Sequence, residues 1–125
     1  MPLKFDHVFA DLGGVASERL SDPQGLAGLL LAAANAAGLH PAAAPAVTAG
    51  PEGVGVALLC RGGHITVHAV PDDGLCFVDV AGLGGGGTHP QRGLDVIIKR
   101  LGAREVRTDA RRRGPVIGTL DQERP

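Results

Sequence analysis

Three short apolar segments separated by two tight turns most constrain how this chain can fold. Residues 53–60, 64–70 and 75–81 are rich in valine, isoleucine, leucine and other apolar residues, as is typical of β-strands. The turns between them are Arg61-Gly62-Gly63 and Pro71-Asp72-Asp73-Gly74, and glycine, proline and aspartate are the usual residues of tight turns. Because tight turns join antiparallel strands, we predict that residues 53–81 form a three-stranded antiparallel meander.

Two segments with helical periodicity lie on either side of this meander. The first starts near Pro23, with Ser21 as the candidate N-cap, and ends at Gly38. The second runs from Pro90 to Gly102. Their apolar stripes are Leu26, Leu29, Leu30, Ala33 and Ala37 in the first helix and Leu94, Ile97, Ile98 and Leu101 in the second. Each helix is therefore expected to pack one apolar face against a sheet.

Strands predicted over residues 3–12 and 103–109 complete the order β-α-β-β-β-α-β. This order favours the α+β class, as a two-layer sandwich in which a mainly antiparallel sheet carries two helices on one face. At 125 residues, a single core is the expected organisation. We assign residues 1–113 to one domain and residues 114–125 to a C-terminal edge segment and tail.

The composition argues against several classes of partner. Twelve Lys and Arg against thirteen Asp and Glu give a formal charge of −1, so no net field attracts nucleic acid or anionic lipid. No apolar run reaches the ~20 residues of a membrane span. The opening residues M-P-L-K-F-D-H lack the apolar region of a secretory signal, so we expect a cytoplasmic protein. Cys60 and Cys76 lie in apolar segments and are expected to be free buried thiols. The run Arg111–Arg113 is interpreted as a solvated tail.

The segment Gly62–Asp72, G-G-H-I-T-V-H-A-V-P-D, resembles the processing segment of the small prokaryotic S-adenosylmethionine decarboxylases, which reads roughly E-S-H-I-S-I-H-T-W-P-E. Further matches are D-L-x-G at Asp11–Gly14, P-x-G at Pro51–Gly53 and F-V-D-V at Phe77–Val80. The resemblance spans residues 5–110. It implies an α/β sandwich that pairs as a dimer, within a family of pyruvoyl-dependent enzymes of polyamine (spermidine) biosynthesis.

The same resemblance implies that the family's chemistry is absent. In the family, the serine at the position of Gly63 becomes the pyruvoyl group by an N→O acyl shift onto its hydroxyl, followed by elimination. Gly63 has no side-chain oxygen, so we expect no self-cleavage and no pyruvoyl cofactor. Thr66 cannot substitute, because the hydroxyl must attack its own preceding peptide. The family's catalytic cysteine aligns with Leu83, and a leucine cannot transfer a proton.

The resemblance further implies a reshaped binding site. The aromatic residue that stacks on adenine aligns with Ala49 and the tryptophan of the motif aligns with Val70, so two stacking contacts worth ~1 kcal/mol each are missing. A serine near the substrate aligns with Gly55. His68, which assists processing in the family, and Asp72, at the position of the family's acid, remain as the candidate catalytic residues.

The predicted ligand pocket follows from the aligned segments, and it comprises Asp11, Gly63, His64, Thr66, Val70 and Leu83. We predict no metal site. His64 and His68 are four residues apart, about 13 Å along a strand, and so cannot share one ion.

Three functions stay open at this point. The chain could be an enzyme of different, cofactor-independent chemistry acting on a small molecule in the inherited pocket. It could be a non-catalytic regulatory or binding module for an active paralogue. The third alternative is a genuine S-adenosylmethionine decarboxylase. The expected assembly is a homodimer, or a heterodimer with a paralogue.

Overall fold

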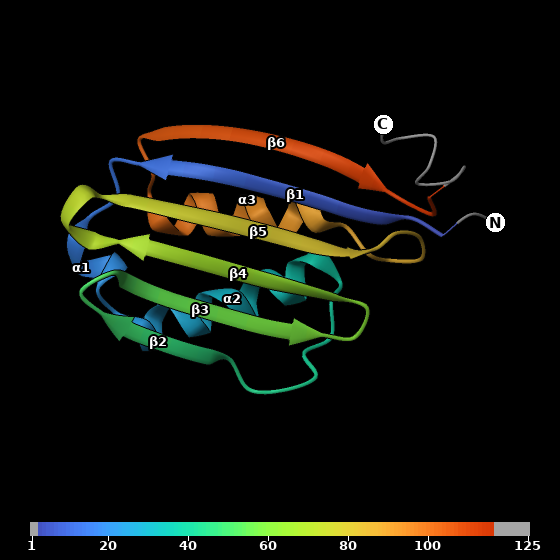
Figure 1. Ribbon diagram of the computed structural model, residues 1–125, viewed down its shortest axis with the longest axis horizontal. Helices are drawn as coiled ribbons and strands as arrows, with labels where there is room; N and C mark the ends of the chain where they lie inside the picture. The colour runs from blue at the N-terminus through green and yellow to red at the C-terminus, as the bar shows by residue number, and fades with distance from the viewer. Residues whose placement is uncertain (1–2, 117–125) are drawn as a thin grey trace, which may run out of the picture.

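The computed structural model describes residues 3–116, which form one six-stranded sheet covered on one face by helices (Figure 1). The strands are β1 (Phe5–Gly13), β2 (Ala46–Gly50), β3 (Gly53–Cys60), β4 (Gly63–Val70), β5 (Leu75–Leu83) and β6 (Glu105–Arg113). The helices are α1 (Ser17–Leu20), α2 (Pro23–Ala37) and α3 (Pro90–Leu101), with a 3-10 turn, η1, at Pro71–Asp73.

All neighbouring strands of the sheet are antiparallel, in the order β2-β3-β4-β5-β1-β6. The meander β3-β4-β5 forms the middle of the sheet, as its turns predicted. The two-residue turn between β3 and β4 needs a positive φ at Gly62, which is +70°, a conformation open to glycine at low cost. The predicted α+β two-layer sandwich is confirmed, but β2 is a sixth strand that the predicted order did not include.

Helix α2 starts at Pro23, as predicted, but its N-cap is not the predicted Ser21. Its N-cap is Asp22, whose carboxylate accepts a hydrogen bond of 2.9 Å from the Gly25 amide. Ser21, the predicted cap, instead donates a hydrogen bond of 2.8 Å to the Ser17 carbonyl. Ser17 begins the short helix α1, which has no apolar periodicity of its own and was not predicted. Gly38 ends α2 in the left-handed conformation, as expected.

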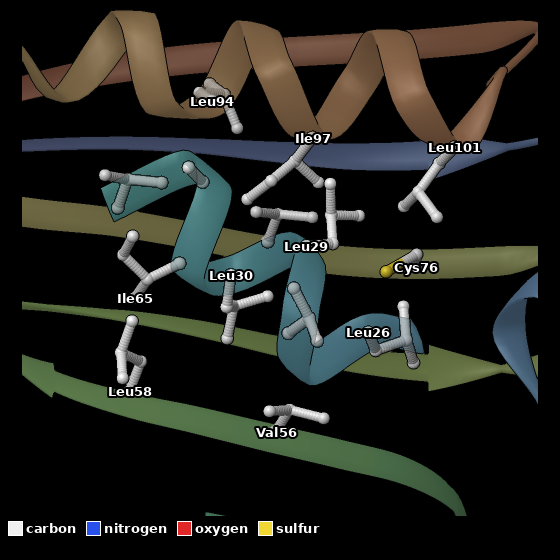
Figure 2. Packing of buried hydrophobic residues seen from close by; sticks show 14 of the residues in the cluster. Leu26, Leu29, Leu30, Val56, Leu58, Ile65, Cys76, Leu94, Ile97 and Leu101 are labelled. Carbon is white, nitrogen blue, oxygen red and sulfur yellow. The ribbon is translucent and has the colours of Figure 1, made fainter. Parts of the chain in front are cut away.

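The core lies between the helices and one face of the sheet (Figure 2). The two helices contribute Leu26, Leu29, Leu30, Leu94, Ile97 and Leu101, and the strands contribute alternate residues such as Val56, Leu58, Ile65 and Cys76. Because strand side chains alternate between faces, the residues between these buried positions lie on the opposite side of the sheet. Among residues 3–116, no helix covers that side, which we call the open face (Figure 1).

The predicted last strand, residues 103–109, is too short at its C-terminal end. Strand β6 continues to Arg113, so the run Arg111–Arg113 belongs to an edge strand and not to a solvated tail. The strand continues because β1 offers it a full partner from Phe5 to Gly13. Arg112 donates a hydrogen bond of 2.8 Å from Nε to the Asp6 carboxylate, which raises the pKa of the guanidinium. Residues 114–116 have no regular structure, and the remainder of the predicted edge segment lies outside the described residues.

Both cysteines are free and buried. Desolvation by burial raises the pKa of the Cys60 thiol and raises that of the Cys76 thiol to about 12. Within residues 3–116, no helix has the length and apolarity that crossing a membrane requires.

Candidate functional site

The open face carries most of the polar and aromatic side chains that the sequence singled out. Its residues alternate with the buried ones along each strand, and the register between strands places them in rows across the sheet. They include Phe5, His7, Phe9, Asp11, His64, Thr66, His68, Val70, Phe77, Asp79, Arg107, Asp109, Arg111 and Arg113. This face carries both charge signs beside the exposed ring of Phe77, so it is the candidate interaction surface of the molecule.

A hollow of about 400 Å³ lies on the open face across β2, β3, β4 and β5, with Thr66, His68, Phe77 and Asp79 in its wall. The absence of a side chain at Gly55 leaves this hollow open. A Cβ at this position would lie in the hollow, 3.0 Å from Thr48 Oγ1 and 3.8 Å from His68 Nδ1. The His68 ring is exposed, and its Nε2 donates a hydrogen bond of 2.9 Å to the Glu52 carbonyl in the β2–β3 turn.

His7, Asp79 and Thr66 form a polar network beside this hollow. His7 Nε2 donates a hydrogen bond of 2.9 Å to Asp79 Oδ1, and Thr66 Oγ1 donates one of 3.5 Å to Asp79 Oδ2. The hydrogen bond to Asp79 gives His7 a partner within the sheet. The alternation along β1 placed His7 on a face but could not identify its partner on β5, seventy-two residues away.

Asp72 is not in the hollow that holds His68. It lies in η1 and lines a separate depression of about 320 Å³ together with Val70, Ala49 and Ser21. His68 and Asp72, the two predicted catalytic residues, therefore border different hollows. The chain turns sharply at Pro71, which carries Asp72 beyond the end of β4 and away from the row of side chains on its open face.

Gly63 and Leu83 lie at the other end of β4 and β5 from His68. Gly63 pairs with Gly82, and Leu83 donates its amide hydrogen bond of 2.8 Å to the Gly62 carbonyl. A Cβ on Gly63 would overlap the Ala81 carbonyl oxygen and would lie 3.0 Å from Leu39 Cδ2. Leu39, which the sequence did not single out, fills the space beside both glycines.

The other predicted pocket residues are engaged with neighbours on the open face. The Asp11 carboxylate accepts a hydrogen bond of 2.8 Å from Arg107. The His64 ring lies 6.0 Å from the Phe5 ring, and Arg113 lies 5.9 Å from the centre of that same ring. Five of the six predicted pocket residues therefore lie along the open face, whereas Gly63 faces the helical layer beside Leu39, so the six do not line one cavity. Across residues 3–116, no three His, Cys, Asp or Glu side chains are grouped closely enough to hold a metal ion.

A further hollow, of about 610 Å³, lies outside the predicted set. It is bordered by the glycine run at Gly85 and Gly86, by His89 at the start of α3, and by the Asp6–Arg112 ion pair. The glycine run and the arginine run were both visible in the sequence. The two runs meet only in the folded chain, where the pairing of β1 with β6 places Arg112 beside Asp6 at this hollow.

This fully antiparallel α+β sandwich, with its open face, belongs to a class of fold that is known from a solved structure. The fold resembles the crystal structure of the adenosylmethionine decarboxylase from Aquifex aeolicus VF5, with a TM-score of 0.80, 26% sequence identity, and coverage of 94% of this chain and 96% of that chain. The S-adenosylmethionine decarboxylase proenzyme of Aquifex aeolicus is 29% identical over 110 residues, which is 88% of this chain and 81% of the relative.

The family model for S-adenosylmethionine decarboxylase matches residues 6–114. The chain belongs to the S-adenosylmethionine decarboxylase family, as the resemblance at residues 62–72 predicted.

Proposed function

We propose that this chain is a family member that does not cut itself and builds no pyruvoyl group. It acts as a non-catalytic, cytoplasmic binding partner of a second chain of the same fold, which docks on the open face. The observation that carries the proposal is the environment of Gly63.

Gly63 and the residues around it do not fit a pyruvoyl group. Its formation needs a hydroxyl-bearing side chain, and a Cβ on Gly63 would overlap the Ala81 carbonyl oxygen and lie 2.9 Å from Gly82 Cα. These two neighbours are backbone atoms, which cannot rotate away as a side chain can. The serines of the chain, Ser17 and Ser21, lie at α1, far along the sequence from this turn.

The placement of His68 and Asp72 supports a binding role over a catalytic one. An acid–base pair must reach the same reacting atoms, whereas these two side chains border separate hollows. The His68 Nε2 atom is also hydrogen-bonded to the Glu52 carbonyl, so this nitrogen holds the β2–β3 turn.

The open face has the chemistry of a docking surface for a chain of the same fold. Phe77 is 43% exposed and Leu59 is 62% exposed, while Asp109 and Arg111 place both charge signs on the same side of β6. A surface that carries both signs can be complementary to a two-fold copy of itself. We therefore name a second copy of this chain as the primary partner, and an active paralogue as the partner through which it would regulate decarboxylation.

Intact mass spectrometry tests the absence of processing. We expect one species with the full 12.7 kDa mass of the chain, while the Aquifex aeolicus proenzyme, expressed in parallel as the positive control, provides the comparison. Two fragments, the larger starting at residue 63 with a blocked end, would overturn the proposal and establish the genuine decarboxylase.

A mixing experiment tests the partner role. The chain is titrated into an active S-adenosylmethionine decarboxylase from the same genome, and both decarboxylation rate and complex mass are followed. We expect a mixed complex and a changed rate. Phe77→Lys, which places a charge on the open face, is expected to abolish both effects. An unchanged rate and no mixed complex would leave only the homodimer and refute the regulatory role.

A second candidate is favoured by the hollow that Gly55 opens beside His68. It would hold a small molecule and make the chain a cofactor-independent enzyme. Calorimetric titration with S-adenosylmethionine and its decarboxylated analogue tests this candidate. A heat of binding that disappears in His68→Ala would support this candidate. No heat of binding with the unmodified chain would exclude both compounds as its ligands.

A further inference from the structure

The two edges of the sheet differ sharply in charge. Strand β6 forms one edge, and all nine of its residues are exposed. Its charged residues are Glu105, Arg107, Asp109, Arg111, Arg112 and Arg113. Charged side chains on an edge strand discourage the addition of another strand, so this edge is protected.

Strand β2 forms the opposite edge and lacks this protection. The segment from Pro41 to Pro51 contains no charged residue, and all of it is exposed except Pro45, which is half-buried. No proline interrupts β2, and its pairing with β3 runs without a bulge from Ala46 to Gly50. An edge strand presents unpaired N–H and C=O groups to solvent. This edge is therefore free to accept a further strand (Figure 1).

We propose that β2 pairs with β2 of a second copy, antiparallel and about a two-fold axis at Thr48, to form a twelve-stranded sheet with six strands from each copy. Thr48 is the central residue of the five-residue strand. The two-fold axis places it opposite the partner subunit's Thr48, and it places Val47, which is 39% exposed, opposite the partner subunit's Ala49. Cross-strand pairs of this kind stabilise a sheet.

A second copy suits this edge better than a free peptide does. A free peptide must lose backbone entropy when it forms a strand, whereas β2 of another copy is already ordered by β3. The uncharged segment gives no repulsion between copies, and each chain has a formal charge of only −1. Because five residues bury less surface than a standard interface of about 1,600 Å², the association is weak and depends on concentration.

Edge pairing is independent of docking on the open face. It uses hydrogen-bonding groups in the plane of the sheet and leaves the open faces of both copies free. Where both contacts form, dimers joined by their faces would associate further through their edges. The test is therefore made in the Phe77→Lys background, which disables the open face, so that the result does not depend on the proposed function.

Light scattering over a concentration series measures the association. We expect Phe77→Lys to dimerise with rising concentration, and addition of Thr48→Lys to weaken this dimer about tenfold, because like charges then lie directly opposite. Thr108→Lys is the matched control, since Thr108 is an exposed threonine on the other edge strand, and it should change nothing.

A charge-swap experiment tests the two-fold register. Thr48→Lys and Thr48→Glu, each weakly associating alone, should pair when mixed, because opposite charges then face each other across the axis. Three results would overturn the proposal: a monomer at every concentration, loss of the dimer in Thr108→Lys, or no recovery in the mixture. Circular dichroism of each variant checks that the fold is retained.

Discussion

Gly63 lies between the backbone of β5 and the side chain of Leu39. Because the Ala81 carbonyl and Gly82 Cα cannot rotate away from an added methyl group, Gly63→Ala should destabilise the chain by about 1–3 kcal/mol. Urea denaturation measures the loss. The control is Gly28→Ala in α2, where a Cβ would meet no atom within 4 Å and the change should stabilise the helix by about 0.5–1 kcal/mol. Equal effects at the two glycines would show that position 63 has room.

The Cys76 thiol provides a pH-dependent prediction at the same scale. Burial raises its pKa to about 12 from the ordinary value of 9.0, so between these values the folded chain keeps a proton that the unfolded chain loses. Its contribution to stability is complete below pH 9 and decreases as the pH rises toward 12.

We expect the free energy of unfolding to fall by up to about 1.4 kcal/mol per pH unit in that interval, and to fall less steeply in Cys76→Ala. Urea titrations of both proteins between about pH 8 and pH 11, a range that begins below the ordinary thiol pKa, measure the two slopes. Parallel slopes would mean that Cys76 ionises as readily in the folded chain as in the unfolded one.

Among the elements, the start of α2 distinguishes two candidate caps. Asp22 accepts the hydrogen bond from the Gly25 amide, whereas Ser21 bonds to the Ser17 carbonyl. Asp22→Ala should therefore cost about 1 kcal/mol of stability, and Ser21→Ala should cost clearly less. Thermal unfolding of the two variants ranks them, and the reverse order would restore Ser21 as the cap.

The elements that the sequence predicted are those with a strong local signal. The meander β3-β4-β5 and the helices α2 and α3 each combine a regular apolar period with glycine or proline at their ends. Strand β6 was predicted too short because four arginines conceal its alternation. Helix α1 has a single buried residue, Leu20, and so offers no periodicity to recognise.

The candidate site was less predictable because its residues are brought together by tertiary register. The alignment identified Gly63, His68 and Asp72, but Leu39 contacts Gly63 from a loop twenty-four positions earlier in the sequence, where no motif marks it. The separation of His68 from Asp72 depends on the 3-10 turn at Pro71. The sequence motif alone does not show that the chain changes direction at this turn.

At the scale of the whole molecule, the open face should control association. Phe77 and Leu31 are almost equally exposed, at 43% and 42%, but Phe77 lies on the open face and Leu31 lies on α2. Phe77→Lys should therefore remove the face-to-face dimer, and Leu31→Lys should preserve it, as measured by analytical ultracentrifugation at low concentration. Loss of the dimer only in Leu31→Lys would place the interface on the helical layer.

The close packing of Gly63 and Gly82 beneath Leu39 also limits how the chain can change by mutation. A mutation that placed a serine at position 63 would meet the Ala81 carbonyl and Leu39 before it could be selected for any chemistry. The family's glutamate at position 62 would also be unfavourable, because Gly62 has a φ of +70°, a left-handed conformation that is costly for residues with a side chain. On the proposed function, several simultaneous changes would therefore be needed before this chain could cut itself.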